Sequence, residues 1–235
     1  MLALGGAAAA WPLLARAQAG VPLVGFLNSG TATSGSGRSF SQGLAEAGFV
    51  EGRNVAVEYR FADGRYDRLP ELIDELTSRN VAVLAATGGV HTALAAKPVS
   101  ARLPVVFANG SDPVRFGLVA SLNKPGGNMT GVSFFTATLE SKRLGLLREL
   151  VPAAERFGAL INPGNANAEA QLQDVEQGGR LLGRPVSIVK ATDEQQIEAA
   201  FAAFSQQRID ALLVAADPFF FGRREVIVAL AAKYR

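Results

Sequence analysis

Short apolar runs alternate with amphipathic segments from residue 21 onward. This order predicts parallel sheets that are covered by helices on both faces. The apolar runs lack alternation, which is typical of strands that are buried on both faces. Residues 55–61 differ, because apolar and charged side chains alternate there, and this predicts a strand with one wet face toward a sheet edge. The predicted buried strands are 21–27, 81–86, 104–108, 156–161, 186–189 and 211–215.

Four segments carry apolar residues at helical spacing, which predicts amphipathic helices. Their stripes are Leu69, Leu72, Ile73 and Leu76; Leu139, Leu146, Leu147 and Leu150; Leu172, Val175, Gly179 and Leu182; and Ile197, Ala200, Phe201 and Phe204. Pro70 suits the first turn of the first helix, and Gly183 suits the end of the third. Thr192 and Gln195 predict a capping box at the start of the fourth.

Residues 124–135 interrupt this rhythm with clustered glycine and proline. We interpret this stretch as the crossing between two lobes, so the first lobe is predicted at 20–133 and the second at 134–235. The predicted fold class is therefore α/β with two lobes, each a mainly parallel sheet with helices on both faces.

The first 19 residues combine an apolar run with small residues, which is typical of an export signal that is cleaved after Ala17 or Ala19. The run is shorter than the roughly 20 residues of a membrane span, and Pro12 interrupts it, so no stable membrane insertion is predicted. The chain contains no cysteine, which excludes a lipidated N-terminal cysteine and fits an oxidising compartment. The predicted location is the periplasm.

Charge and motifs exclude several function classes. The net charge is +2 without a basic run, so nucleic acid and anionic membranes are poor candidate partners. Gly30 and Gly35 have P-loop spacing, but Ser36 and Gly37 stand where Lys and Ser or Thr must follow. The chain has no G-x-S-x-G motif and no Cys, and His91 is its only His. We therefore predict no catalytic residues, no metal ligands and no cofactor.

Short hydrogen-bonding side chains beside glycines follow the apolar runs in both predicted lobes. Ligands of doubly wound sheets bind beyond the carboxyl ends of the strands, where these residues are expected. The candidate ligand-binding residues are Asn28, Ser29, Thr87, Gly88, Asn109, Ser111, Asn162 and Asp217. They suit a small polar or zwitterionic molecule. Backbone amides at helix starts and the hydroxyls of Ser29 and Thr87 can hold a carboxylate, and Asp217 can accept a hydrogen bond from an ammonium group.

These residues also have a purely structural interpretation, because Asn, Ser, Thr and Asp after a strand are ordinary turn and cap residues. Both interpretations stay open for Asn28, Ser29, Thr87 and Asp217. We interpret Asp112 as a cap before Pro113, His91 as a polar surface residue, and 219–221 as core or interlobe packing. An aromatic or aliphatic part of the ligand fits against Phe26, Phe134 or Phe219.

The most specific motif lies between residues 105 and 133. It reads Val-Val-Phe-Ala-Asn-Gly-Ser-Asp-Pro-Val from Val105, and then Lys-Pro-Gly-Gly-Asn-Met-Thr-Gly-Val-Ser from Lys124. Supporting motifs lie at 43–54, 142–144, 162–163 and 210–214. With these motifs the chain resembles, over essentially its whole length, the ABC-transporter substrate-binding proteins of the tryptophan/tyrosine-binding (TrpX-like) kind.

This resemblance implies a two-lobed type I periplasmic-binding-protein fold that closes on a small molecule such as an amino acid. It implies that the ligand is passed to the permease and ATPase of the same transporter, and that the chain acts as a monomer. It places the loops at Asn28 and Ser29, at Thr87 and Gly88, at Asn162 and at Asp217 on the cleft. Family members continue with a stretch that returns to the first lobe, so the second lobe is expected to be truncated at residue 235.

Two other function classes stay open at this point. One is an extracytoplasmic ligand-sensing domain that signals through a partner. The other is an exported α/β enzyme that uses the carboxylates of Asp112 and Asp217 as acid and base. Polar strand ends in both predicted lobes, without a catalytic set, favour the solute-binding protein over the enzyme.

Overall fold

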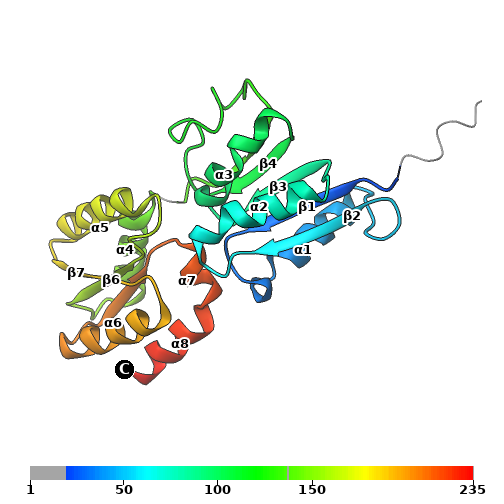
Figure 1. Cartoon of the computed structure of the whole chain (residues 1–235). Coiled ribbons are helices and arrows are strands. Elements are labelled where there is room, and N and C mark those ends of the chain that lie inside the picture. Colours follow the sequence, from blue (N-terminus) through cyan, green and yellow to red (C-terminus); the bar gives the residue numbers. More distant parts are fainter. Residues whose placement is uncertain (1–19, 137, 235) are drawn as a thin grey trace, which may run out of the picture.

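The computed structural model describes residues 20–136 and 138–234, and these form two α/β lobes, each built on its own parallel sheet (Figure 1). The predicted export signal at 1–19 lies outside the described residues. The first sheet has the strand order β2-β1-β3-β4-β5 and the second has the order β7-β6-β8. The strands are β1 (Leu23–Asn28), β2 (Ala56–Phe61), β3 (Val83–Thr87), β4 (Val105–Asn109), β5 (Met129–Ser133), β6 (Phe157–Ile161), β7 (Val186–Lys190) and β8 (Ala211–Val214).

Helices join these strands in both lobes. The α-helices are α1 (Ser36–Glu46), α2 (Leu69–Ser78), α3 (Val90–Ala96), α4 (Glu140–Leu150), α5 (Ala168–Leu182), α6 (Glu194–Gln206), α7 (Pro218–Gly222) and α8 (Arg224–Lys233). The described part of the chain also forms the short 3₁₀ helices η1 (Ala32–Ser34), η2 (Tyr66–Arg68) and η3 (Pro98–Ala101). No helix among the described residues has the length and apolar character that a bilayer crossing requires.

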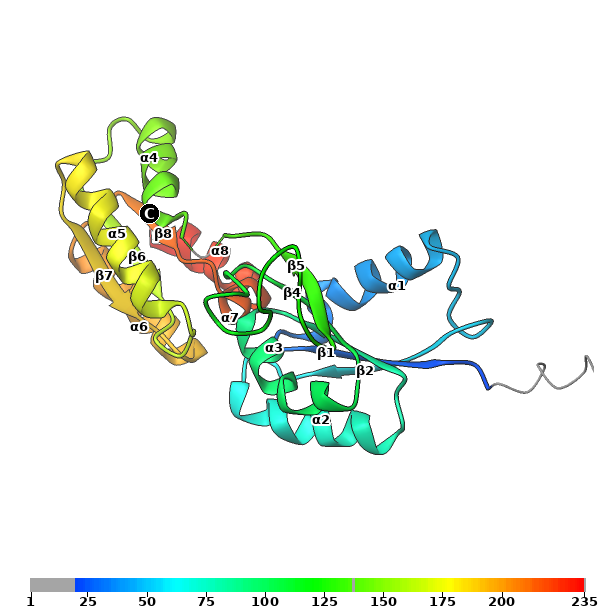
Figure 2. The same ribbon diagram turned by 90° about the horizontal axis from the view of Figure 1, so that it is seen from above.

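The first lobe buries its main core between the sheet and helices α2 and α3, while α1 lies on the opposite face (Figure 2). Alternation along β1 explains this division, because neighbouring side chains point to opposite faces. Leu27 belongs to the core under α2 and α3, whereas the ring of Phe26 packs 4.8 Å from that of Phe40 on α1. The helical stripe predicted at 69–76 is confirmed, since all four of its residues are buried in α2.

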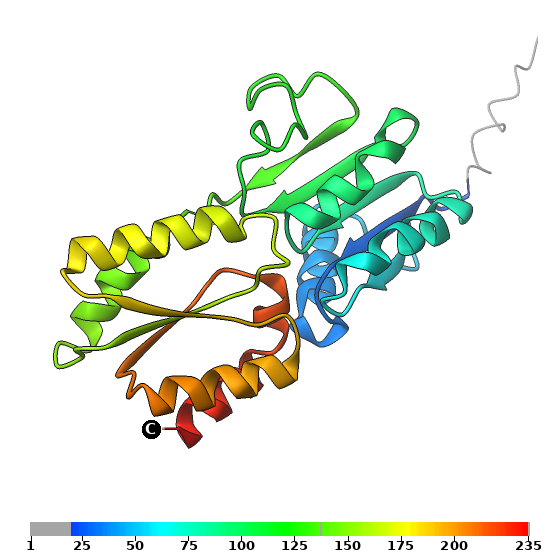
Figure 3. The ribbon, with the colours of Figure 1, turned by 60° about the vertical axis from the view of Figure 1, so that its left-hand side comes forward.

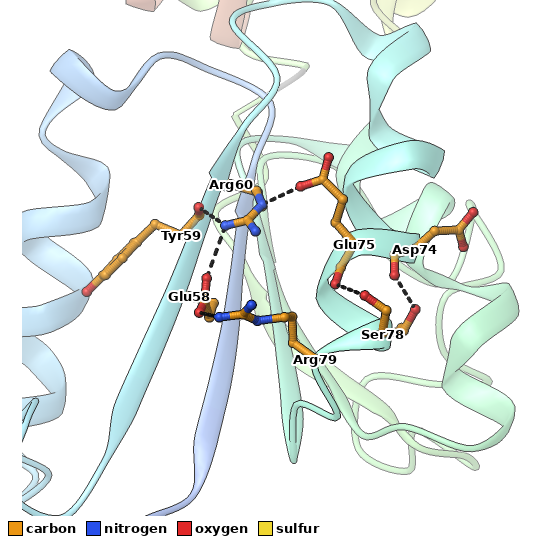
Figure 4. A network of polar contacts seen from close by, with 8 residues as sticks. Glu58, Tyr59, Arg60, Asp74, Glu75, Ser78 and Arg79 are labelled. Carbon is orange, nitrogen blue, oxygen red and sulfur yellow. Dashed lines mark hydrogen bonds and ion pairs between the residues drawn. The ribbon is translucent and has the colours of Figure 1, made fainter.

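The alternating strand is β2, and its predicted position at the sheet edge is confirmed. Its charged side chains are half-buried instead of wet, because they join an ion network with α2 (Figure 4). The guanidinium of Arg60 contacts Glu75 at 2.6 Å and Glu58 at 3.2 Å, and Arg79 contacts Glu58 at 2.7 Å. Hydrogen bonds from both arginines lower the pKa of Glu58. Charges of this kind protect an exposed strand edge from pairing with another chain.

The second lobe buries one core on each face of its sheet (Figure 3). Helices α4 and α5 pack on one face with Leu144 and Val175, and α6, α7 and α8 pack on the other. The helices predicted at 172–182 and 197–204 are confirmed, and Gly183 ends α5 in the left-handed conformation with φ of 64°.

The interpretation of residues 124–135 as an interlobe crossing is partly wrong. The stretch contains β5, the fifth strand of the first sheet. Strand β5 pairs in parallel with β4 along its whole length. Its Gly131 sits so close to the neighbouring strand that an added Cβ would lie 2.1 Å from the Phe107 carbonyl oxygen. Glycine is therefore a packing requirement within this strand, and its presence does not mark a loop here.

Two helix details also differ from the predictions. The N-cap of α6 is Asp193, whose carboxylate accepts from the Gln196 N–H at 2.8 Å, so the cap lies one residue after the predicted Thr192. The Gln196 Oε1 accepts the Thr192 N–H at 2.9 Å in place of the predicted Gln195 contact. In α4 two residues of the predicted leucine stripe face solvent, with Leu146 at 50% and Leu150 at 79% exposure, whereas Leu147 packs against the core. The face that packs on the sheet carries Glu140 and Leu144 instead.

Candidate functional site

A cavity of about 710 Å³ lies between the two lobes. The first lobe contributes the carboxyl ends of β1, β3 and β4 and the first turns of α1 and α3. The second lobe contributes the loop 165–167 and the segment 216–221 after β8. Parallel strands bring these carboxyl ends to the same edge of each sheet, so the two edges meet across the cavity.

Six of the predicted site residues line this cavity, namely Asn28, Thr87, Gly88, Asn109, Ser111 and Asp217. The other two, Ser29 and Asn162, lie behind its wall. The Ser29 hydroxyl is fully buried and donates to the Gly88 carbonyl oxygen. The Asn162 side chain is 3% exposed, and its amide donates to Asp217 Oδ1 at 3.2 Å.

Four asparagines form the same local turn around the cavity. In each, the side-chain Oδ1 accepts the backbone N–H two residues later, at distances of 2.7–2.9 Å. The four are Asn28, Asn109, Asn162 and Asn165. Such Asx turns let a strand end without leaving backbone amides unpaired. The structural interpretation of the strand-end residues is thus correct for these positions, and the same turns shape the wall of the cavity.

The bond to Oδ1 also fixes which way each amide group faces. The Asn28 Nδ2 donates to the Thr87 hydroxyl at 2.9 Å, and the Asn165 Nδ2 donates to Asp217 Oδ2 at 2.7 Å. Asn109 differs, because its Nδ2 is buried and has no hydrogen-bond partner among the described residues. A buried donor without a partner destabilises the chain by about 1–3 kcal/mol.

Asp217 is the centre of the polar network on the second-lobe side. It caps α7, and its Oδ1 accepts from the Phe220 N–H at 3.1 Å as well as from Asn162. Its Oδ2 accepts from Asn165 and from the Tyr66 hydroxyl at 3.1 Å. A carboxylate has about four acceptor positions, and four donors occupy them here. An ammonium group would have to displace one of these donors, so the predicted ammonium contact remains a prediction.

A second carboxylate supports this wall from behind. Glu140 is fully buried, and its Oε1 accepts the Ala216 N–H at 3.0 Å. Its Oε2 contacts the Arg143 guanidinium at 2.7 Å. Burial raises the pKa of Glu140, while the bonds to Ala216 and Arg143 oppose this effect. The contact explains why a charged side chain occupies the inner face of α4.

Aromatic rings from both lobes form the apolar part of the lining. Phe26 and Phe40 come from the first lobe, Phe134 follows β5, and Phe221 comes from α7. Phe134 and Phe221 are 62% and 59% exposed, so these two rings are free to meet a ligand. The predicted contact at Phe219 is wrong, because this residue packs in the core of the second lobe. The interpretation of 219–221 as packing residues is therefore correct for Phe219 and Phe220 and wrong for Phe221, which lines the cavity.

The cavity is nearly free of charge. Among the described residues that line it, the only titratable side chains are His91 and Asp217, and none is Lys or Arg. A ligand carboxylate would therefore be held by neutral donors such as backbone amides and hydroxyls.

Several residues have a role in the cavity that the sequence does not predict. His91 was interpreted as a surface residue, but it is half-buried, lines the cavity, and accepts the Ala166 N–H at its Nε2 at 2.7 Å. Its ring stacks on Tyr66 with the centroids 4.2 Å apart. Burial lowers the pKa of His91. His91 is the only histidine of the chain, and this could have marked it as a candidate site residue. Nothing in the local sequence marks Tyr66 or Phe40 in the same way.

Asp112 is a cap, as predicted. Its exposed carboxylate accepts the N–H groups of Val114 at 2.9 Å and Arg115 at 3.3 Å. It does not line the cavity, so the structure does not bring together in the cleft the Asp112 and Asp217 pair that an acid–base enzyme would need.

Two parallel α/β lobes whose polar strand ends face each other across a cavity define a two-lobed binding protein of the type I periplasmic kind. Residues 28–235 match the family model described as ABC transporter substrate binding protein, and the chain belongs to this family.

Relatives with known names agree with this membership. A tyrosine-binding protein of Clostridioides difficile is 23% identical over 194 residues, which cover 83% of this chain and 55% of the relative. The chain thus spans about half the length of this curated relative.

Solved structures share the fold. A conserved domain protein from Vibrio cholerae superimposes with a TM-score of 0.79 at 23% identity, covering 91% of this chain and 72% of the other. An ABC domain from Streptococcus pneumoniae in complex with L-Trp gives a TM-score of 0.76 at 21% identity, covering 91% and 71%.

Proposed function

We propose that this chain is the solute-binding component of an ABC importer and holds a small polar or zwitterionic molecule in the cleft between its lobes. The observation that carries this proposal is the cavity of about 710 Å³, whose wall joins hydrogen-bonding strand ends from both lobes to the exposed rings of Phe134 and Phe221. A ligand that contacts both walls stabilises the closed arrangement, and the closed form is the one presented to the permease and ATPase.

An aromatic amino acid is the first candidate ligand. Phe134 and Phe221 offer ring faces, and the hydroxyls and amides between them offer hydrogen bonds. Relatives support this choice, since one is described as tyrosine-binding and one is a complex with L-Trp.

We also propose how the two lobes are arranged along the chain and where the protein acts. The lobes divide at residues 133/134 and move about the segment that joins β5 to α4. The protein acts as a monomer in the periplasm after loss of residues 1–19. Asn28, Thr87, Gly88, Asn109, Ser111 and Asp217 form the ligand contacts, with Ser29 and Asn162 behind them.

Thermal unfolding with added ligands tests this function. L-tryptophan, L-tyrosine, L-phenylalanine and 3,4-dihydroxybenzoate form the panel, with L-leucine and L-glutamate as comparisons. A ligand at a hundred times its Kd adds about 2.7 kcal/mol of stability, which appears as a rise in the unfolding temperature. A panel in which no compound raises that temperature contradicts the proposal.

A pair of variants tests whether the ligand binds in the cleft. Phe221→Ala removes an exposed ring from the cavity wall, and we expect at least a tenfold loss of affinity. Phe49→Ala removes a ring of similar exposure that does not line the cavity, and it is expected to leave Kd unchanged. Equal affinities of the two variants, measured by calorimetry, contradict this position for the ligand.

A further inference from the structure

Two side chains of the first lobe reach across the cleft as a stacked pair. Tyr66 lies in η2 and His91 in the first turn of α3, and their rings lie 16° from parallel at a centroid distance of 4.2 Å. The Tyr66 hydroxyl donates to Asp217 Oδ2 at 3.1 Å. The His91 Nε2 accepts the Ala166 N–H at 2.7 Å. Each ring therefore makes one hydrogen bond to a different segment of the second lobe.

The stacking makes these two bonds depend on each other. A ring that turned away would lose its own hydrogen bond and also its contact with the other ring. Asp217 is held in turn by Asn162, Asn165 and the α7 amide, so the acceptor that Tyr66 meets is fixed in position.

The contact at Ala166 requires neutral His91. A backbone N–H donates, so Nε2 must offer a lone pair and the ring proton must sit on Nδ1. Protonation would place an N–H against the Ala166 N–H and would leave that amide without its acceptor.

The charged groups around His91 are few. Tyr66 faces it from η2 and keeps its proton, because burial and the nearby Asp217 raise its pKa. Asp217 faces it from the start of α7, and its charge favours protonated His91. The loop residues 164–166 carry no titratable side chain. Burial has the largest effect and lowers the pKa of His91, while a backbone hydrogen bond at Gly164 and the charge of Asp217 oppose it. His91 is therefore less protonated in the closed arrangement than in an open one.

We propose that Tyr66 and His91 form an interlobe clasp, which holds the lobes together without a ligand and is released when His91 takes up a proton. Tyr66 does not line the cavity, so it acts as a positioning residue that sets ligand affinity through the closed population. The clasp concerns the ligand-free chain and does not require the proposed transport function. Acidification below about pH 6.5, where histidine ordinarily titrates, favours the open arrangement.

Single-molecule fluorescence transfer in the ligand-free chain tests the clasp. The chain has no cysteine, so Ser78→Cys in α2 and Glu198→Cys in α6 give two unique, exposed labelling sites on different lobes. At pH 7.5 we expect the closed population to dominate, and at pH 5.5 we expect the open-to-closed ratio to rise about two- to tenfold.

Two variants separate the two halves of the clasp. Tyr66→Phe keeps the stacked ring but loses the bond to Asp217, so it raises the open population already at pH 7.5. Tyr59→Phe is the matched control, because the Tyr59 hydroxyl donates to Glu51 within the first lobe. His91→Gln offers an acceptor that does not titrate, so its populations stay the same at both pH values.

Two results would overturn the proposal. One is a closed population of Tyr66→Phe equal to that of the unmodified chain at pH 7.5. The other is a pH response in His91→Gln as large as that of the unmodified chain. Neither result depends on a ligand, so a failure of the clasp stays separate from a failure of the binding function.

Discussion

Residues that follow one another at a strand end have different surroundings here. Asn28 lines the cavity while Ser29 beside it is fully buried, because consecutive side chains point to opposite sides of an extended chain. The sequence locates the strand end and its polar residues, but it does not say which of these side chains faces the cleft. The same limit applies to Asn162, which lies behind Asp217.

Gly88 shows why a glycine occupies a predicted site position. Its φ is 82°, and an added Cβ would lie 2.7 Å from the Ser29 amide nitrogen and 2.8 Å from Asn28 Oδ1. The glycine is therefore required by packing within the first lobe, in addition to any approach of a ligand to its amide.

We expect Gly88→Ala to destabilise the chain by about 2 kcal/mol or more, because the left-handed backbone and the contacts with Asn28 and Ser29 both oppose a side chain. Urea unfolding followed by circular dichroism measures this loss. Gly127→Ala is the control, since an added Cβ there meets nothing within 4 Å. A similar unfolding midpoint for both variants contradicts the argument.

At the scale of elements, periodicity predicted three helices correctly, but in the fourth it placed two exposed leucines, Leu146 and Leu150, on the inner face. In α2, α5 and α6 the apolar stripe packs on the sheet, as hydrophobic burial requires. In α4 a buried Glu140 binds the Ala216 amide, so the inner face is set by a polar contact that helical spacing does not reveal. Strand β5 was missed because its Gly131 was attributed to a loop.

The face of α4 is open to a direct test. Leu144→Ala is expected to cost about 2–5 kcal/mol of unfolding free energy, because Leu144 is fully buried between α4 and α5. Leu150→Ala removes an equal volume from a side chain that is 79% exposed, and its effect is expected to stay within about 0.5 kcal/mol. Chemical denaturation compares the two, and a reversed order would restore the leucine stripe as the inner face.

At the scale of the whole molecule, the two-lobed α/β class followed from the order of apolar runs, whereas the contacts between lobes did not. Tyr66 and Asp217 lie 151 positions apart in the chain, and local periodicity carries no information about such a pair. The sequence thus located the cleft at the strand ends and two of its rings, Phe26 and Phe134, but the rings of Phe40 and Phe221 and the clasp required the structure.

A disulfide tests the closeness of the lobes. An added Cβ at Gly222 in α7 would lie 3.3 Å from Cγ2 and 3.5 Å from Oγ1 of Thr31 in the first lobe. The Thr31 Oγ1 marks a position that a cysteine sulfur can take, so this contact brings the two side chains within reach of a disulfide, in which the Cβ atoms lie about 3.8 Å apart. We expect the double variant Thr31→Cys/Gly222→Cys to crosslink under mild oxidation and to gain up to about 5 kcal/mol against unfolding.

Non-reducing electrophoresis and urea unfolding report the bridge and its effect. The two single variants are the controls, because each leaves one thiol without a partner in a chain that otherwise has none. A double variant that stays reduced while the single variants fold normally would contradict the lobe arrangement described above.

The near absence of charge in the cleft has a kinetic consequence. Among the described lining residues no Lys or Arg is present, and the Asp217 carboxylate is covered by four donors. Little electric field is left to draw a charged molecule inward, so the encounter rate is expected to change little with ionic strength. Capture is then governed by how often the entrance opens, and the stacked rings of Tyr66 and His91 set that frequency.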